Sequence, residues 1–376
     1  MTHTTRTESR RASRRASRRA VLGGALAAGG AALAAPALAQ AGRTVRLAAS
    51  WPADLGGLGD SVKRVAETIT TLSGGRLKVD VYWPGQLVGP LAVHDAAGAG
   101  EIEMYHSAEY YFGAKHRGLN FFTTVPLGLT SLEQASWIEH GGGQALWDEL
   151  NARFGVKALP CGGTGVQMGG WFDKKIESVE DLRGLTMRIP GLGGQVMQEL
   201  GAETVALPGG AIVGALFDKS IDATEWVGPW NDLHFGFQKL LSTYVYPGFH
   251  EPHTMASLGF NLAFWQSLSA EERAIVETAA QAENTLHTAA FYGNNAMALT
   301  QLLLEDGVKP TRLPDDVWNA ISRKAFEVVA SVAEDDDLGG RIYRSFEAHR
   351  TLMVGAAPAS QAEYLSRRGL DGVFAL

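Results

Sequence analysis

Cysteine is nearly absent from this sequence, because Cys161 is the only one among 376 residues. A single cysteine forms no intramolecular disulfide and excludes a metal cluster built on cysteine ligands. Long apolar runs are scarce too: after residue 39 none reaches the roughly 20 residues needed to span a membrane. We therefore expect a soluble mature protein, and 376 residues with 45% apolar side chains are enough for two domains.

Positive charge is scarce outside the N-terminus. Residues 1–19 hold seven arginines and one acid, so the chain without residues 1–39 carries 26 basic and 39 acidic side chains, a formal charge of −13. This charge disfavours nucleic acid as a partner. An anionic ligand would have to be held by a local cationic side chain that acts against the overall field.

The N-terminus predicts export. After the arginine-rich residues 1–19, an apolar run over residues 21–39 ends in Ala37-Leu38-Ala39, the small-x-small pattern that signal peptidase accepts. A membrane anchor is the alternative, but this run is rich in Gly and Ala and only weakly hydrophobic. We interpret residues 1–39 as a cleaved signal. The segment 17–22, with Arg18 and Arg19, resembles a twin-arginine signal and predicts a periplasmic location.

The mature chain alternates between strand and helix patterns. In the first region we expect strands at 44–49, 77–82, 101–105 and 156–160 and helices at 59–72 and 132–154. In a second region, beginning near Gly165, we expect strands at 166–172, 185–190, 203–207 and 221–226 and helices at 194–200 and 211–217. The apolar run 255–265 could return the chain to the first region. The pattern predicts a two-domain α/β architecture.

The C-terminal third is different. Ser269 precedes 36 residues without proline, which predicts one long or kinked helix over 269–305 with Ser269 as its N-cap. A second helix is expected at 314–334. The acidic residues 334–337 then predict a solvated turn before a last helical segment at 342–354.

Two strand ends carry side chains suited to binding an anion. Arg188 ends an apolar strand, and ligands of open α/β sheets bind beyond the carboxyl ends of strands, where a guanidinium can grip a carboxylate with two hydrogen bonds. Glu225 and Trp226 end another strand and offer a carboxylate for a hard cation beside a flat apolar wall. Structural roles remain open: a surface arginine, an acid that caps a helix, and an indole that fills the core.

Other motifs are weaker. His250-Glu251-Pro252-His253 has zinc-binding side chains, but its spacing is not that of a helical zinc motif, and Pro252 disfavours a helix. The glycines at 191–194 lack the lysine of a phosphate loop and favour a turn at a helix start. An exported lyase or hydrolase with Glu225, Glu251 or His250 as general base would need a nucleophile or activated water, and no nucleophile–base pair has a recognisable spacing.

Several segments together resemble the substrate-binding subunits of tripartite ATP-independent periplasmic (TRAP) transporters, and more narrowly the branch that binds 2-oxo acids, lactate or related carboxylates with a cation. The resemblance covers nearly the whole mature chain. It is carried by the N-terminal signal, Ser50-Trp51-Pro52, residues 107–113 with Tyr110 and Tyr111, residues 185–191 with Arg188, residues 221–226 with Glu225 and Trp226, and residues 246–252 with Glu251.

The resemblance implies a role for each matching residue. Arg188 would pair with the substrate carboxylate, and the cation would be held by Gln167, Glu225 and the carbonyl of Trp226, with Glu251 as a further pocket acid. The expected substrate contacts are Arg188, Gln167, Trp226, Tyr110, Tyr111 and Glu251, and the expected cation ligands are Gln167, Glu225, Trp226 and Glu251. A sodium or calcium ion bridging to the substrate removes the repulsion between these acids and an anion.

The fold implied is a two-lobed α/β periplasmic binding protein with a hinge, mixed sheets flanked by helices and a long C-terminal spanning helix. We expect lobe I at 40–164 and 255–290, lobe II at 165–254, and bracing helices at 269–376. The chain would cross between the lobes at 161–171 and 255–265 and close over its ligand. The implied partners are a small organic acid anion and the TRAP membrane subunits, with a homodimer through C-terminal helices as a hypothesis. A receptor for an ABC importer is the alternative.

Overall fold

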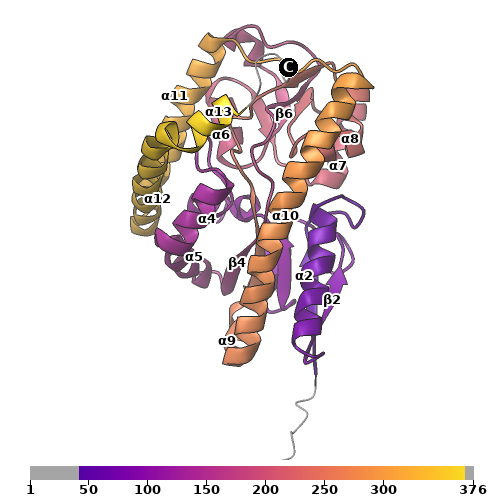
Figure 1. The fold of residues 1–376 in the computed structure, drawn as a ribbon, viewed down its shortest axis with the longest axis vertical. Helices are drawn as coiled ribbons and strands as arrows, with labels where there is room; N and C mark the ends of the chain where they lie inside the picture. Colours follow the sequence, from indigo (N-terminus) through magenta and orange to yellow (C-terminus); the bar gives the residue numbers. More distant parts are fainter. Residues whose placement is uncertain (1–41, 369–376) are drawn as a thin grey trace, which may run out of the picture. The chain divides into compact units, whose positions relative to one another are not determined.

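The computed structural model describes residues 42–368, so the predicted signal at 1–39 lies outside the described residues. Two five-stranded sheets organise this part of the chain (Figure 1). We call the first sheet and its helices lobe I and the second sheet and its helices lobe II. The predicted fold class, mixed sheets flanked by helices in two lobes, is confirmed.

The sheet of lobe I has the strand order β2-β1-β3-β10-β4. β1 lies parallel to β2 and β3, as expected for strand-helix-strand units with crossover helices, whereas β10 lies antiparallel to β3 and β4. Residues 255–261 of the apolar run 255–265 lie in this sheet as β10, between β3 and β4. The strands are β1 (Arg43–Ala49), β2 (Leu77–Tyr82), β3 (Met104–Ser107), β4 (Val156–Gly163) and β10 (Met255–Asn261).

The sheet of lobe II has the order β7-β6-β8-β5-β9. Its β6 lies parallel to both neighbours, while β5 lies antiparallel to β8 and β9. The strands are short, two or three residues each. They are β5 (Gly170–Phe172), β6 (Thr186–Arg188), β7 (Glu203–Val205), β8 (Ala223–Thr224) and β9 (Thr243–Val245).

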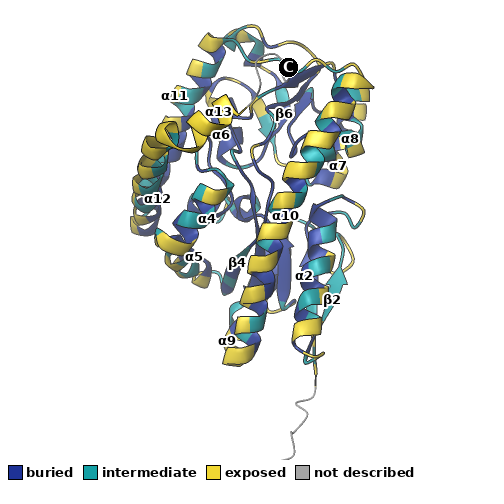
Figure 2. Cartoon of the chain, in the orientation of Figure 1, coloured by how far each residue is buried: buried dark blue, intermediate teal, exposed yellow. Residues whose placement is uncertain are grey.

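Helices flank the sheets, and the inner strands are mostly buried, whereas the edge strands β2 and β7 are largely of intermediate burial (Figure 2 shows β2 in teal). In lobe I the helices are α2 (Leu58–Leu72), α3 (Val93–Ala99), the 3-10 turns η1 (Glu109–Phe112) and η2 (Arg117–Phe122), α4 (Ser131–His140) and α5 (Gly143–Ala152). In lobe II they are the turns η3 (Val179–Leu182) and η4 (Phe237–Lys239) and the helices α6 (Gly191–Glu199), α7 (Gly209–Phe217) and α8 (Pro229–Phe235). A short α9 (Leu262–Ser267) follows β10.

The single helix predicted over 132–154 is wrong. The structure has two helices there, α4 and α5, separated by Gly141 and Gly142. Gly142 has φ of 86°, a left-handed conformation that glycine adopts without steric cost and that stops helix propagation.

The long C-terminal helix is confirmed as α10 (Ala270–Leu304). It begins where predicted, since the hydroxyl of Ser269 accepts a hydrogen bond from the amide of Glu272 at 3.2 Å. α10 packs against α2 and β4 of lobe I and against α8 of lobe II, and Figure 1 shows it beside α2. Arg64 of α2 pairs with the buried Glu283 of α10 at 2.6 Å. The helix is thus placed to brace both lobes.

Three further helices complete the described chain: α11 (Asp315–Ser331), α12 (Asp337–Ala356) and α13 (Gln361–Arg367), with the 3-10 turns η5 (Val332–Glu334) and η6 (Ala357–Ala359). α12 starts earlier than the predicted 342, because the Asp336 carboxylate caps it by accepting from the Gly339 amide at 2.7 Å. Asp336 also pairs with Arg153, so the acidic turn is tied to lobe I. Within residues 42–368 no helix is both long and apolar enough to cross a membrane.

Candidate functional site

Strand pairing brings Arg188 and Glu225 together. β6 and β8 are parallel neighbours with Arg188 opposite Thr224, so Arg188 and Glu225 leave the sheet at the same edge. The Glu225 amide donates to the Arg188 carbonyl at 3.2 Å, which continues the ladder by one residue. This edge is the carboxyl end of two parallel strands, where open sheets place their ligands.

The Arg188 guanidinium is fully buried and held on all sides. Its Nε donates to the Leu207 carbonyl at 3.0 Å, Nη1 to the Glu225 carbonyl at 3.1 Å and to the Glu225 carboxylate, and Nη2 to the hydroxyl of Tyr111 at 3.3 Å. The Trp226 ring lies against it, 4.9 Å from Cζ to the ring centroid. Burial disfavours the charged form, yet the charge of Glu225 keeps the Arg188 pKa above its ordinary value.

A second acid, Glu251, lies beside this pair in a hydroxyl and amide cage. Gln167 Nε2 donates to Glu251 Oε2 at 2.8 Å, and Thr254 Oγ1 donates to the same oxygen. Gln167 Nε2 also lies 2.6 Å from Thr254 Oγ1 and 3.2 Å from Thr164 Oγ1. Backbone pairing explains the contact, since the Gln167 amide donates to the Glu251 carbonyl at 3.2 Å.

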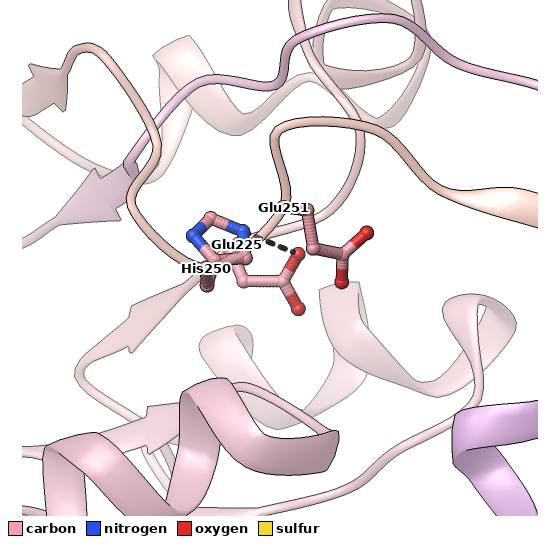
Figure 3. A group of neighbouring side chains, drawn as sticks. All are labelled: Glu225, His250 and Glu251. Carbon is pink, nitrogen blue, oxygen red and sulfur yellow. Dashed lines mark ion pairs between the residues drawn. The ribbon is translucent and has the colours of Figure 1, made fainter. Parts of the chain in front are cut away.

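Glu225, His250 and Glu251 form a compact buried cluster (Figure 3). One side-chain ligand atom from each lies within 4.8 Å of the others. His250 Nε2 is 3.3 Å from Glu225 Oε2, an ion-pair contact, and neither atom has a hydrogen-bond partner among the described residues. Arg188, Gln167, Glu225 and Glu251, predicted from four separate segments, thus lie at one site, and His250 lies with them.

Burial and charge set the protonation of this cluster. Burial, with the nearby Glu225 charge, raises the Glu251 pKa to about 7. For His250, burial acts to lower the pKa, but the ion pair with Glu225 and the charge of Glu251 outweigh it, and the pKa is raised. Two acids side by side resist carrying two negative charges without additional positive charge.

The residues present fit a hard cation. Two buried oxygen atoms, Glu225 Oε2 and Gln167 Oε1, have no hydrogen-bond partner within residues 42–368. Unpaired buried polar atoms are costly, and carboxylate and amide oxygens are the ligands that calcium prefers. The Trp226 carbonyl follows Glu225 directly in the chain. The cluster offers a single histidine and no cysteine ligand, so oxygen donors suit it better than a zinc set.

Lobe I contributes aromatic side chains. Tyr110 and Tyr111 stack with ring centroids 4.6 Å apart, and Trp51 lies 6.1 Å from Tyr111 and 6.5 Å from Trp226 across the lobes. Burial raises the pKa of both tyrosines, so their hydroxyls stay neutral. They border a narrow cavity lined by Trp51, Leu58, Tyr110, Tyr111, Thr164, Gln167, Trp226, Val227 and Thr254. Tyr111 bonds to Arg188, whereas Tyr110 also lines a second small cavity beside His250 and Glu251.

Sequence reasoning missed the two threonines. Thr164 and Thr254 position the Gln167 amide, and no motif marks them as functional. The only available signal is that Thr254 follows Glu251 by three residues in an irregular segment. His250 was considered only as a zinc ligand or general base, while the structure makes it a neighbour of both acids.

Comparison with known proteins defines the class. Residues 49–336 match the family described as bacterial extracellular solute-binding protein, family 7, and the chain belongs to this family.

Individual relatives narrow the class. The monocarboxylate 2-oxoacid-binding periplasmic protein of Nostoc sp. is 40% identical over 322 residues, which cover 85% of this chain and 87% of the relative. A TRAP periplasmic solute binding protein from Pseudoalteromonas atlantica, solved with bound sodium and pyruvate, has a TM-score of 0.84 and 35% identity over 87% of this chain and 100% of that one. Another from Colwellia psychrerythraea, solved with bound calcium and pyruvate, has a TM-score of 0.83 and 33% identity over 86% of this chain and 99% of that one.

These matches confirm that the chain is a TRAP solute-binding subunit. They favour this assignment over an exported lyase or hydrolase, because the family and these relatives are solute-binding proteins. They favour it over a receptor for an ABC importer, because the two solved relatives are TRAP solute binding proteins. The family is extracytoplasmic, and its role in transport implies the TRAP membrane subunits as partners.

Proposed function

We propose that this protein captures a small 2-oxo or 2-hydroxy monocarboxylate together with a sodium or calcium ion and presents it to the TRAP membrane subunits. One observation carries the proposal: the fully buried Arg188 lies beside two buried acids, Glu225 and Glu251. Two oxygen atoms at this site, Glu225 Oε2 and Gln167 Oε1, are buried and have no hydrogen-bond partner among residues 42–368. The relatives solved with pyruvate and either cation support the same ligand class.

The charges in the site favour one carboxylate. Arg188 is the only buried Lys or Arg in residues 42–368. A ligand carboxylate would accept hydrogen bonds from Arg188. The other residues expected around it are Gln167, Trp226, Glu251, Tyr110 and Tyr111. A second ligand carboxylate would find no second buried lysine or arginine among residues 42–368, and an unpaired buried charge is costly.

The proposed cation ligands are Gln167, Glu225, Glu251 and the Trp226 carbonyl. When bound, the cation supplies positive charge between these acids and the anionic ligand. In the present geometry the Glu225 carboxylate pairs with Arg188. A cation beside Glu225 would compete for that carboxylate and leave Arg188 donors for the ligand, which gives a physical reason for co-binding.

Closure of two lobes is the proposed binding motion, with lobe I at 40–164 and 255–290 and lobe II at 165–254. The chain would bend at 161–171 and 255–265. The contact between Tyr111 of lobe I and Arg188 of lobe II supports this motion, because it joins the aromatic face to the charged face.

The decisive experiment is thermal unfolding of the ligand-stripped mature protein with 2-oxo, 2-hydroxy and simple carboxylic acids, each with and without sodium or calcium. A ligand at one hundred times its Kd stabilises the folded state by about 2.7 kcal/mol. We expect stabilisation by short 2-oxo or 2-hydroxy acids that depends on the cation and is lost in Arg188→Ala. Stabilisation by neutral solutes alone would contradict the proposal.

A homodimer through the C-terminal helices is part of this proposal. It is supported by apolar side chains of α12 and α13 that are at least half exposed, namely Leu352, Tyr364 and Leu365. A monomer mass by light scattering would contradict the dimer.

For residues 1–39 we propose twin-arginine export. Replacement of Arg18 and Arg19 by lysine should then block the appearance of mature protein in the periplasm.

A further inference from the structure

Trp51, which lines the cavity at the predicted substrate site, has its indole held by a hydrogen bond to the buried His106. Trp51 follows β1 and His106 lies in the adjacent β3, where it stands opposite Ala49. The indole Nε1 donates a hydrogen bond to His106 Nδ1 at 2.8 Å, and both side chains are buried. Trp51 lines the cavity at the predicted substrate site, whereas His106 does not.

The hydrogen bonds fix the tautomer of His106. An indole N–H can only donate, so Nδ1 accepts and carries no proton. Nε2 therefore carries the proton and donates to the Cys161 carbonyl, 3.1 Å away, with the Ser61 hydroxyl at 3.3 Å. Burial lowers the His106 pKa to about 4, so the ring stays neutral at ordinary pH. Thus Nδ1 of His106 binds the Trp51 indole in the cavity wall, and Nε2 binds the backbone of β4.

The Cys161 carbonyl is itself a fixed point. The next two amides are held by α10: Gly162 donates to Asn284 Oδ1 at 3.0 Å and Gly163 to His287 Nδ1 at 2.9 Å. A side chain at Gly163 would collide with His253 and Thr288, each 2.4 Å from an ideal Cβ position. Polar contacts therefore run without interruption from α10 through β4 and His106 to Trp51.

We propose that His106 is a positioning residue that holds Trp51 as a rigid wall and so limits the size of the ligand's side chain. This inference rests on the proposed function. Trp51 meets Tyr111 of its own lobe and Trp226 of the other lobe. Without its hydrogen bond the indole can leave this position, and the cavity can then accept a bulkier group beyond C2 of the acid.

The test compares Kd values for pyruvate and the branched acid 4-methyl-2-oxopentanoate. In His106→Leu we expect the preference for pyruvate to fall about 5-fold, the factor that one hydrogen bond of ordinary strength contributes. Trp51→Phe, which removes only the donor and part of the ring, should change the ratio in the same direction, and the double variant should add nothing further. His106→Gln, which offers an acceptor and a donor, should keep the ratio within about 2-fold of wild type.

His94→Leu is the matched control, because His94 is an equally buried histidine of lobe I that does not line this cavity. It should lower the melting temperature and leave the ratio unchanged. An unchanged ratio in a folded His106→Leu protein, or additive effects in the double variant, would overturn the inference. Wild-type protein that binds no 2-oxo or 2-hydroxy monocarboxylate in the presence of sodium or calcium would instead refute the proposed function.

A measurement that needs no ligand tests the role of His106 even if wild-type protein binds no acid or if His106→Leu does not fold. The Trp51 indole N–H proton, assigned by its absence in Trp51→Phe, should resonate downfield and resist solvent exchange in wild type and in His106→Gln. An unshifted, rapidly exchanging Trp51 proton in wild type would contradict the fixed wall.

Discussion

Lobe I and lobe II present opposite chemistry to the space between them. Lobe II contributes the charges, Arg188, Glu225 and Glu251, all buried. Lobe I contributes neutral aromatic side chains, Trp51, Tyr110 and Tyr111. The charged face is fixed by strand pairing, while the aromatic face is built from a strand exit and the turn η1.

This division suggests an order of events. A charged group attracts an anion at a distance, whereas aromatic side chains act only on contact. Lobe II would therefore capture ligand first, and lobe I would exclude water as the lobes close. Removing the Arg188 charge should then abolish binding, while altering an aromatic hydroxyl should only weaken it.

The largest effect is expected for Arg188→Ala. Loss of the guanidinium removes the arginine partner of the buried Glu225 carboxylate, and breaking a buried ion pair costs about 3–5 kcal/mol. We expect the free energy of unfolding to fall by that amount in urea titration and ligand binding to disappear in calorimetry. Arg46→Ala is the control, because its pair with Glu103 is partly exposed and should contribute at most about 1 kcal/mol. Equal losses in the two variants would contradict a special role for the buried pair.

The next effect is expected for Glu225→Gln. The substitution keeps the shape and removes the charge that the proposed cation needs. We expect acid binding at least 10-fold weaker, about 1.4 kcal/mol, and no longer dependent on sodium or calcium. Calorimetric titration of the acid at several cation concentrations measures both. If binding in Glu225→Gln still depends on the cation, residues other than Glu225 hold the ion.

The lobe I face should respond less. Tyr111→Phe removes the hydroxyl that accepts from Arg188 at 3.3 Å, and because this bond is long we expect it to contribute no more than an ordinary hydrogen bond, about 0.5–1.5 kcal/mol. We expect binding to weaken by about 2- to 12-fold. Tyr110→Phe, which leaves the stacked pair intact, should bind nearly as wild type. A larger loss in Tyr110→Phe would reverse the two roles.

The smallest effect on binding is expected for Asp232→Asn in lobe II. The Asp232 carboxylate accepts from Trp171 Nε1 at 3.1 Å and from the Tyr244 hydroxyl at 2.7 Å, away from the cavity. Burial raises its pKa from 3.8 to about 7. The folded state then binds a proton that the unfolded state has lost, so this group's contribution to stability should decline as pH rises from about 4 to 7.

In Asp232→Asn the decline in stability that this group causes between about pH 4 and 7 should vanish. Urea unfolding at pH 5 and pH 8 gives the free energy of unfolding of wild type and variant, and the difference between the two proteins should change between the two pH values. Ligand affinity should stay unchanged in the variant. A stability difference that does not depend on pH would show that Asp232 is ionised in the folded protein.

Local sequence signals predicted most elements of the fold. Alternating apolar residues marked β1 and β2, and Ser269 marked the start of α10, because capping and periodicity act over a few residues. The helix predicted over 132–154 failed at Gly141 and Gly142, since its apolar pattern runs through a break made by backbone conformation. The strand boundaries of lobe II were predicted too long, because tertiary packing decides where a short strand stops.

The amino-acid sequence by itself determined the charge balance, the α/β alternation and the strand ends at Arg188 and Glu225. These follow from residue type and short-range periodicity. Family resemblance added Gln167 and Glu251 to the expected site.

Only the tertiary structure decided which of these residues meet. The pairing of β6 with β8 sets the contact between Arg188 and Glu225, and the pairing of residue 167 with residue 251 adds Gln167 to Glu251. The role of His106 also depends on the pairing of β1 with β3 and on the place of β4 in the same sheet, with β10 between β3 and β4. Such contacts join residues far apart in the chain, and no local pattern encodes them, because their energy depends on the packing of the whole lobe.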